Sequence, residues 1–346
     1  IVVGKTHTVE YAFGGWGTNP VAGTPVNPHD AVTHRVPGGS SSGTGVAVGA
    51  GLVPIGFGTD TGGSVRLPAA WCGTVGHKTS MGLVSRAGVV PLALHFDTIG
   101  PLSRTVRDAA VMSQVMLGSD PADGSTRGAP GLDLVTGLGA GVAGLTVGVL
   151  AIDPSIAVDG EVAARFDAAV AALEKAGARI VPVSLPETLS AYTAACGELM
   201  MVEGAHHHGA LARETPCRLG AWAARRIGGG FDIPATQYFA GVEARRARIA
   251  AANAFMAGSG VDALVLPTTP GPAVPLSQVD EAGAPGIFTR FVNYLEWCGV
   301  SVPAGLTTTG LPVGFQVVAP RFRDPLALRI AQAVETATGG PLPLPA

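Results

Sequence analysis

The chain has 346 residues, of which 47% are hydrophobic and 14% are charged, a composition that fills a sizeable core and argues against disorder. The net charge of −3 gives no reason to expect nucleic acid or an anionic membrane as a partner. The sequence shows neither an apolar run of the roughly 18 residues needed to span a bilayer nor a signal-peptide pattern, so we expect a soluble cytoplasmic protein.

The predicted elements at the start of the chain are short and separated by glycine-rich segments. Residues 1–3 are apolar and bounded by a glycine, which predicts a buried strand. Such a strand is an unusual beginning, so we interpret it as the continuation of a segment that lies before it. Residues 17–39, rich in Pro, Gly, Asn and Thr, are predicted to form a loop. A helix of small residues is expected over 42–52, followed by a strand over 53–58.

The middle of the chain carries the clearest periodic signals. A helix is predicted over 104–117, and residues 118–141 are expected to form an exposed connector. A strand over 145–150, an amphipathic helix over 160–176 and a strand over 179–183 then form a βαβ unit. Such a unit requires a parallel or mixed sheet.

The remainder of the chain is predicted to be mostly helical over 187–256, with a strand over 263–266 and a final helix over 326–336. No repeat of 20–50 residues is evident, which excludes solenoids and propellers. We therefore expect an α/β fold organised as a single domain over residues 1–346.

Two loops rich in glycine and serine carry the pattern that points to chemistry. The first runs over residues 37–45 and contains Ser40, and the second runs over 58–68 and contains Ser64. Because the loops flank one predicted helix–strand unit, both can converge on one place. Glycines beside a serine let backbone N–H groups approach a substrate carbonyl without a Cβ in the way. Such N–H groups stabilise the developing oxyanion in acyl-transfer catalysis.

Other interpretations of these loops differ in how well the residues fit them. A lone loop of this composition is more often a flexible turn. A phosphate-binding loop is not supported, because the GxxxxGK[ST] motif is absent. A nucleophile elbow of the GxSxG type is also absent, because Ser64 is followed by Val65 and Arg66.

Taken together, the two loops resemble those of the amidase signature family. Residues 38–43 are similar to the family's GGSSxG loop and residues 58–66 to its GTDxGGSxR loop, with the family's spacing between the two serines (64 − 40 = 24). Shorter similar segments lie along most of the chain, at residues 4–6, 76–79, 84–88, 97–101, 104–106, 266–270 and 310–316. The resemblance implies an α/β/α sandwich around a central mixed β-sheet.

The resemblance also implies hydrolysis of a carboxylic amide to an acid and ammonia or an amine. Ser64 corresponds to the nucleophile that forms the acyl-enzyme, and Ser40 to a bridging serine whose peptide bond is cis. The implied oxyanion hole consists of the backbone N–H groups of Thr61, Gly62, Gly63 and Ser64.

Three further residues are expected to support the site: Ser41, Asp60 and Arg66. Asp60 and Arg66 share the second loop and are expected to pair and hold it rigid. The implied partner is a small-molecule amide substrate rather than nucleic acid or a membrane. No metal or organic cofactor is implied, and the family admits a homodimer.

The proton acceptor implied by the resemblance is a neutral lysine, which would lie before Ile1. The chain's own lysines are Lys5, Lys78 and Lys175. Lys175 is expected to be solvated, and the other two match positions that are not catalytic in the family. Either the lysine-bearing segment precedes this sequence, which we favour, or Lys5 substitutes in a natural truncation. A chain complete as given is expected to be weakly active or inactive.

Two alternative functions stay open on the sequence. A non-catalytic amidase-like subunit would account for the absent lysine but not for the retained serines and glycines. An ammonia-supplying subunit of a transamidation complex shares the same motifs. The substrate is not readable, and we expect the acyl pocket to be built from residues 119–140 and 187–256.

The remaining candidate groups favour structural roles. Three adjacent histidines, at residues 206–208, point in different directions on a helix, which favours a surface or partly buried trio over a metal site. The four cysteines form no CxxC pair and are interpreted as buried thiols; they are Cys72, Cys196, Cys217 and Cys298. Trp71 and Trp297 are expected in the core.

Overall fold

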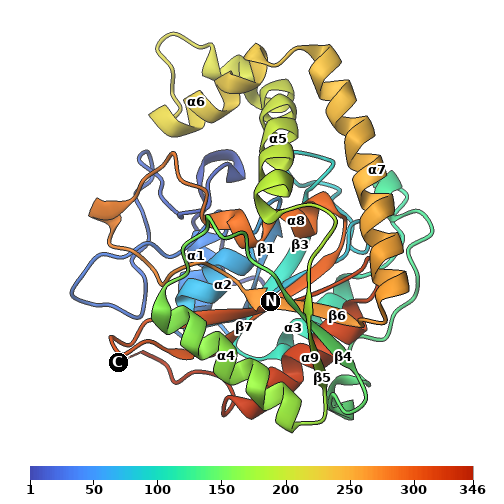
Figure 1. The fold of residues 1–346 in the computed structure, drawn as a ribbon. Coiled ribbons are helices and arrows are strands. Elements are labelled where there is room, and N and C mark those ends of the chain that lie inside the picture. The colour runs from blue at the N-terminus through green and yellow to red at the C-terminus, as the bar shows by residue number, and fades with distance from the viewer. Residues whose placement is uncertain (346) are drawn as a thin grey trace.

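A single eight-stranded sheet organises the computed structural model, which describes residues 1–345 (Figure 1). The strand order is β1-β3-β2-β7-β8-β6-β4-β5. The strands are β1 (Ile55–Asp60), β2 (Val75–Lys78), β3 (Thr98–Ser103), β4 (Thr146–Leu150), β5 (Arg179–Val183), β6 (Ala263–Pro267), β7 (Cys298–Leu306) and β8 (Pro312–Ala319). The α-helices are α1 (Ser42–Gly49), α2 (Arg66–Cys72), α3 (Val106–Met116), α4 (Gly160–Lys175), α5 (Leu189–Ala212), α6 (Ala221–Gly229), α7 (Ala235–Ser259), α8 (Arg290–Tyr294) and α9 (Asp324–Ala337).

The sheet is mixed, as expected from the βαβ unit. β4 pairs in parallel with β5 and with β6. The strands from β6 through β8, β7, β2 and β3 to β1 pair in antiparallel fashion. The predicted unit of β4, α4 and β5 is therefore confirmed, and it occupies one edge of the sheet, whereas β1 forms the other edge.

Helices cover both faces of this sheet, because the central strands alternate apolar side chains between two cores. On β6, Val265 packs into a core formed with α3, α4 and α9. Its neighbours Leu264 and Leu266 pack into a second core, formed with α5, α7 and α8. Figure 1 shows α4 and α9 on one side of the strands and α5 and α7 on the other. The α/β/α sandwich predicted from the sequence is confirmed.

Helix boundaries follow recognisable caps. The Thr105 side chain accepts a hydrogen bond from the Asp108 N–H at the start of α3, and the Asp159 side chain accepts from two N–H groups at the start of α4. Side-chain oxygens at these positions satisfy donors that the helix itself leaves free. Both helices begin within two residues of the predicted positions.

Two predictions about the start of the chain are wrong. Residues 1–3 form no strand and are exposed, because no strand of the described residues pairs with them and apolar character alone does not supply a ladder. The predicted strand over 53–58 instead begins at Ile55 and continues to Asp60, because Asp60 still pairs with Thr98 of β3. The first three residues of the second glycine-rich loop, 58–60, therefore belong to a strand.

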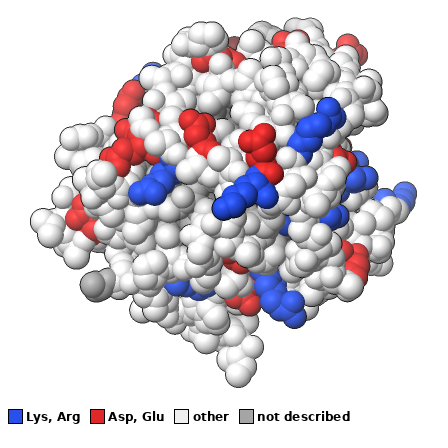
Figure 2. Space-filling view, turned by 60° about the horizontal axis from the view of Figure 1, so that its bottom comes forward, with Lys and Arg blue, Asp and Glu red and all other residues white. Residues whose placement is uncertain are grey.

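The surface carries charges of both signs in a scattered arrangement. On the face drawn in Figure 2, Lys and Arg side chains alternate with Asp and Glu among uncharged residues, and neither sign forms a continuous patch. Within residues 1–345, no helix combines the length and the apolar character needed to cross a membrane.

Candidate active site

The fold brings the two glycine- and serine-rich loops into contact. The first loop ends where α1 begins at Ser42, and the second leads from β1 into α2. The Ser41 N–H donates to the carbonyl oxygen of Ser64 at 3.2 Å, which joins the two loops directly. The Gly39–Ser40 peptide bond is cis, as the resemblance implied.

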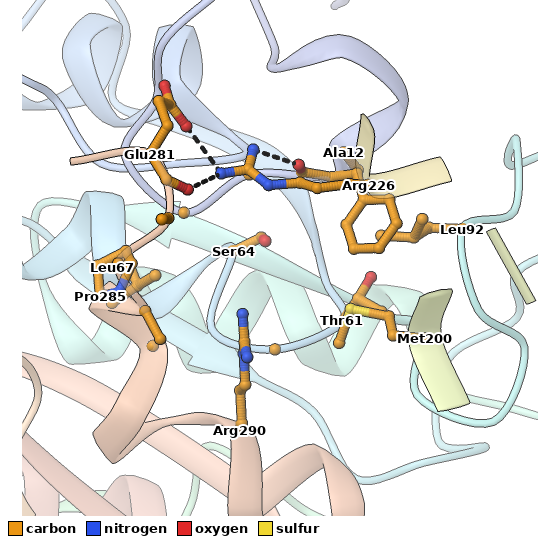
Figure 3. A pocket seen from close by; sticks show the side chains of 18 residues that line it. Ala12, Thr61, Ser64, Leu67, Leu92, Met200, Arg226, Glu281, Pro285 and Arg290 are labelled. Atoms are coloured by element: carbon orange, nitrogen blue, oxygen red, sulfur yellow. Dashed lines mark hydrogen bonds and ion pairs between the residues drawn. The ribbon is translucent and has the colours of Figure 1, made fainter. Parts of the chain in front are cut away.

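Ser64 lies at the floor of a pocket of about 150 Å³. Its side chain is 7% exposed, and in Figure 3 it points into the space between Arg226 and Arg290. The pocket is lined by residues from six parts of the chain: 12–15, 61–67, Leu92, Met200, Arg226 and 281–290. A hydroxyl at this position is accessible to a small ligand.

Ser40 is fully buried beside this pocket, and its hydroxyl has no hydrogen-bond partner within residues 1–345. Its carbonyl oxygen accepts from Val9 N at 3.1 Å and from the Thr8 hydroxyl at 2.9 Å. Its neighbour Ser41 donates its hydroxyl to the Thr59 carbonyl oxygen at 3.3 Å. The structure therefore places Ser40 in the loop that contacts Ser64, but no hydrogen bond joins the two hydroxyls. A buried polar group without a partner is costly, which makes this hydroxyl a notable exception.

The predicted oxyanion loop presents three N–H groups that lack an acceptor in the described part of the chain: those of Thr61, Gly62 and Ser64. The fourth, that of Gly63, donates to Asp60 Oδ1 at 2.7 Å. Gly63 has a φ of +127°, and a Cβ there would collide with the Thr289 side chain. Glycine is therefore required at this position for both backbone conformation and space.

Asp60 and Arg66 form the ion pair expected from the sequence, at 2.9 Å between Arg66 Nη2 and Asp60 Oδ1. Both side chains are fully buried. Asp60 also accepts from the Gly63 and Val65 N–H groups, so the carboxylate shapes the loop on either side of Ser64. Burial by itself would raise the pKa of Asp60, but the Arg66 charge and hydrogen bonds from Arg66 and Asn293 lower that pKa to about 2.

The Arg66 guanidinium uses every one of the five N–H donors that an arginine carries. Its Nε donates to Asp60, its Nη1 to Thr289 O at 3.0 Å and Gln316 Oε1 at 2.7 Å, and its Nη2 to Asp60 and to Asn293 Oδ1 at 2.7 Å. The second loop is thereby fixed to residues more than two hundred positions away in sequence. These distant partners were not identified from the sequence.

Two side chains hold the oxyanion loop from the opposite side. The Thr61 hydroxyl donates to Asp97 Oδ1 at 2.6 Å, and the Thr289 hydroxyl donates to the Gly62 carbonyl oxygen at 2.6 Å. Burial raises the pKa of Asp97, although the hydrogen bonds that it accepts from Thr61 and from backbone N–H groups oppose the shift.

None of the chain's lysines is placed to accept a proton from Ser40. Lys5 and Lys175 are exposed. Lys78 is buried, but its Nζ donates to the carbonyl oxygens of Thr79 at 2.8 Å and Trp297 at 2.7 Å. Burial and the nearby Arg66 charge lower the pKa of Lys78 to about 8.

The pocket wall contains charged residues that were not identified from the sequence. Arg226 Nη2 pairs with Glu281 Oε2 at 2.8 Å, and Arg226 Nη1 donates to the Phe13 carbonyl oxygen at 2.9 Å. Arg290 enters the pocket from α8 and is drawn in Figure 3 without a bonded partner. These residues belong to no motif. Their only sequence signal is charge within an otherwise apolar segment, as for Arg290 in Ile-Phe-Thr-Arg-Phe-Val.

The predicted acyl pocket is therefore only partly correct. The helical segment 187–256 contributes Met200 and Arg226, but none of the residues 119–140 lines this pocket or the adjoining cavity. Residues 12–15 and 281–290 take that place. The connector instead packs Leu134 and Leu138 into the core with α3, because these apolar side chains are better buried than exposed at a pocket rim.

The other candidate groups lie apart from Ser64. His206 is exposed and His208 is buried, with its Nε2 2.6 Å from the Pro91 carbonyl oxygen. The described residues contain no cluster of His, Cys, Asp and Glu suited to a metal ion. Cys72, Cys196 and Cys298 are buried thiols as expected, whereas Cys217 is exposed, which corrects that prediction. It lies in the polar connection between α5 and α6, where no core is available.

Comparison with known proteins identifies the family to which this chain belongs. A model of the Amidase family matches residues 1–328. The chain is 36% identical to a component of the glutamyl-tRNA(Gln) amidotransferase of Acidobacterium capsulatum, over 97% of this chain and 75% of that protein. It is 36% identical to 2-amino-5-chloromuconic acid deaminase of Comamonas testosteroni, over 98% of this chain and 72% of that protein. Native peptide amidase from Stenotrophomonas maltophilia has a TM-score of 0.85 at 30% identity, covering 100% of this chain and 75% of that one.

Proposed function

This chain belongs to the amidase family, and on that premise we propose that it hydrolyses a carboxylic amide through an acyl-enzyme on Ser64. The observation that carries the proposal is the position of the Ser64 hydroxyl in a pocket, beside three backbone N–H groups that have no acceptor among residues 1–345. A nucleophile and a set of oxyanion donors in one small pocket are the main requirements of acyl transfer.

The proposed reaction begins with attack of Ser64 Oγ on the amide carbonyl carbon. The oxyanion that forms accepts hydrogen bonds from the N–H groups of Thr61, Gly62 and Ser64, while the Gly63 N–H holds Asp60 in place. Ser40 relays the Ser64 proton, which then reaches the leaving ammonia or amine. Water attacks the acyl-enzyme in a second step and releases the acid. No step of the proposed reaction changes an oxidation state.

The unpaired Ser40 hydroxyl supports this relay role. In the described residues it has no partner, so its donor and acceptor sites are both free for proton transfer. The final acceptor implied by the family is a neutral lysine. Since Lys5, Lys78 and Lys175 are placed elsewhere, we expect substitution of any one of them to leave acylation of Ser64 unaffected unless it unfolds the chain.

Labelling with a serine-directed fluorophosphonate, followed by mass spectrometry of the labelled peptide, tests the proposal. We expect the label on Ser64 in the wild type and none in Ser64→Ala. Ser41→Ala is the matched control, because it removes a neighbouring hydroxyl that bonds to Thr59 and should still be labelled at Ser64. A fully folded wild-type chain that takes no label would contradict the proposed nucleophile.

A second candidate function is the supply of ammonia to a transamidation complex. It is favoured by the 36% identity to a protein named as part of an amidotransferase. The two functions share the acyl-enzyme and differ in whether ammonia release requires partner proteins. Ammonia release by the isolated chain from simple amides supports a free-standing amidase. Release from glutamine that appears only with added partner proteins supports the second candidate.

A further inference from the structure

Arg290 is a charged residue of the Ser64 pocket that has no hydrogen-bond or ion-pair partner among residues 1–345. It begins α8, directly after Thr289, and its side chain lines both the Ser64 pocket and an adjoining outer cavity. Figure 3 shows the guanidinium pointing from α8 towards Ser64, with no dashed line reaching it. Burial lowers the pKa of Arg290, and the nearby Arg226 charge lowers it further.

The carboxylates nearest in the pocket wall do not neutralise it. Glu281 is occupied on both oxygens, by Arg226 at 2.8 Å and by the Thr18 hydroxyl. Glu198 lines the outer cavity, but no ion pair within residues 1–345 joins it to Arg290. With Arg226 and Glu281 paired to each other, the wall of the Ser64 pocket keeps one uncompensated positive charge.

The guanidinium lies close to the reacting centre. A Cβ built on Gly62, two residues before Ser64, would lie 3.2 Å from Arg290 Cγ and 3.7 Å from Nε. A Cβ built on Gly197 of α5 would lie 3.5 Å from Nη1. Arg290 therefore occupies the gap between the oxyanion loop and α5, and the absence of side chains at these two glycines leaves room for it.

We propose that Arg290 binds the carboxylate of an amide substrate whose acyl group is itself acidic, a half-amide of a short dicarboxylic acid. This inference rests on the proposed function. A half-buried guanidinium without a partner, in the same pocket as the Ser64 hydroxyl, is available to an anionic group of a ligand. The planar guanidinium fork matches a carboxylate with two parallel hydrogen bonds. A cavity of about 150 Å³ is comparable to one that holds benzene, which favours a short acyl chain.

The test compares three amides of similar size, which end in a carboxylate, a methyl group or an ammonium group: glutaramate, valeramide and δ-aminovaleramide. We expect kcat/KM for ammonia release to be highest for glutaramate and lowest for δ-aminovaleramide. In Arg290→Met we expect kcat/KM for glutaramate to fall about 10²–10³-fold, the usual cost of removing one partner from a desolvated charge pair. The value for valeramide should stay close to that of the wild type.

Two further variants distinguish the effect of the guanidinium's shape from the effect of its positive charge. Arg290→Lys keeps the charge but loses the fork, so its kcat/KM for glutaramate should lie between those of the wild type and Arg290→Met. Arg225→Met is the matched control, because Arg225 is exposed and lies over Trp222 outside the pocket. It removes the same charge and should leave the preference for glutaramate unchanged.

Binding of glutarate, measured by calorimetry on Ser64→Ala with and without Arg290→Met, gives a readout that needs no catalysis. Binding that is lost with Arg290 supports the inference. Equal binding in both proteins, or equal kcat/KM for glutaramate and valeramide in the wild type, overturns it and leaves amide hydrolysis intact. A wild type that neither hydrolyses an amide nor takes a label on Ser64 overturns the proposed function, and glutarate binding still decides the role of Arg290.

Discussion

Two arginines next to the Ser64 loop differ in their contacts. Arg66 is fully buried, each of its five donors meets an acceptor, and its charge is paired with Asp60. Arg290 is half-buried in the pocket wall, and no hydrogen bond or ion pair joins it to another of the residues drawn in Figure 3. The two are linked through one residue, Thr289, which accepts from Arg66 and precedes Arg290 in the chain.

This difference distinguishes a residue that stabilises the site from a residue that is available to a ligand. A fully bonded buried charge fixes the shape of the loop and is costly to disturb. Arg290 forms no hydrogen bond within residues 1–345, so hydrogen bonds from its guanidinium do not fix the shape of the loop. We therefore interpret the Arg66 region as the rigid support and the Arg290 region as the part kept available for a ligand.

The strongest test of this comparison is to substitute each arginine in turn. Arg66→Met should lower the free energy of unfolding by about 3–5 kcal/mol, because it leaves the Asp60 carboxylate buried and unpaired. Urea denaturation followed by circular dichroism measures this. Arg225→Met, an exposed substitution of the same kind, should change the value by less than about 0.5 kcal/mol. An Arg66→Met protein as stable as this control would refute the supporting role.

The contribution of the Asp60–Arg66 ion pair to stability should depend on pH, because acid protonates the Asp60 carboxylate. Because the folded-state pKa of Asp60 is about 2, against 3.8 for an unperturbed aspartate, its contribution to stability is fully present above about pH 4. It is lost as the pH falls from about 4 to about 2, a difference of about 2 kcal/mol. Unfolding measured across this range should show it. Arg290→Met should follow the wild-type profile in acid, because no carboxylate of the described residues pairs with Arg290; a different acid limb would argue against that assignment.

Removing the unpaired arginine should have a smaller effect, of opposite sign. Arg290→Met replaces a half-buried charge that has no partner with an apolar side chain of similar length, so the free energy of unfolding should rise by less than about 1 kcal/mol. Thermal unfolding without ligand checks the sign. A clear loss of stability would mean that Arg290 serves the fold, and the comparison with Arg66 would then fail.

The smallest expected change in stability comes from Ser40→Ala. The buried hydroxyl that this substitution removes has no partner within residues 1–345, so stability should stay within about 0.5 kcal/mol of the wild type or rise slightly. Hydrolysis should nevertheless fall by about 10²-fold or more, because the proposed proton relay is lost. Ser41→Ala gives the converse pattern, a small loss of stability with the chemistry retained. Equal activity of Ser40→Ala and the wild type would remove Ser40 from the mechanism.

How far the sequence could lead is clearest at these same residues. Ser40, Ser64, Asp60 and Arg66 were identified because they lie within two short motifs whose glycines and hydroxyls imply a chemistry. Local contacts such as the Asp60–Arg66 pair span six residues, so a motif can contain both partners.

The pocket wall could not be predicted in this way. Arg226, Glu281 and Arg290 come from separate elements, and their contacts depend on how α5, α6 and α8 pack over the sheet. The same limit applies to β7 and β8, which are buried on both faces. They show no alternation of apolar and polar residues by which a strand could be recognised.

The hydrogen bonds from Arg66 to Asn293 and Gln316 also determine when, during synthesis of the chain, the Ser64 loop can be held in place. The nucleophile lies in the first fifth of this sequence, whereas these two anchors lie in its last fifth. During synthesis, Ser64 leaves the ribosome long before the groups that hold its loop have been made. A nascent chain therefore contains Ser64 before it contains the residues that hold the Ser64 loop, so the proposed hydrolysis requires that both anchors have been translated.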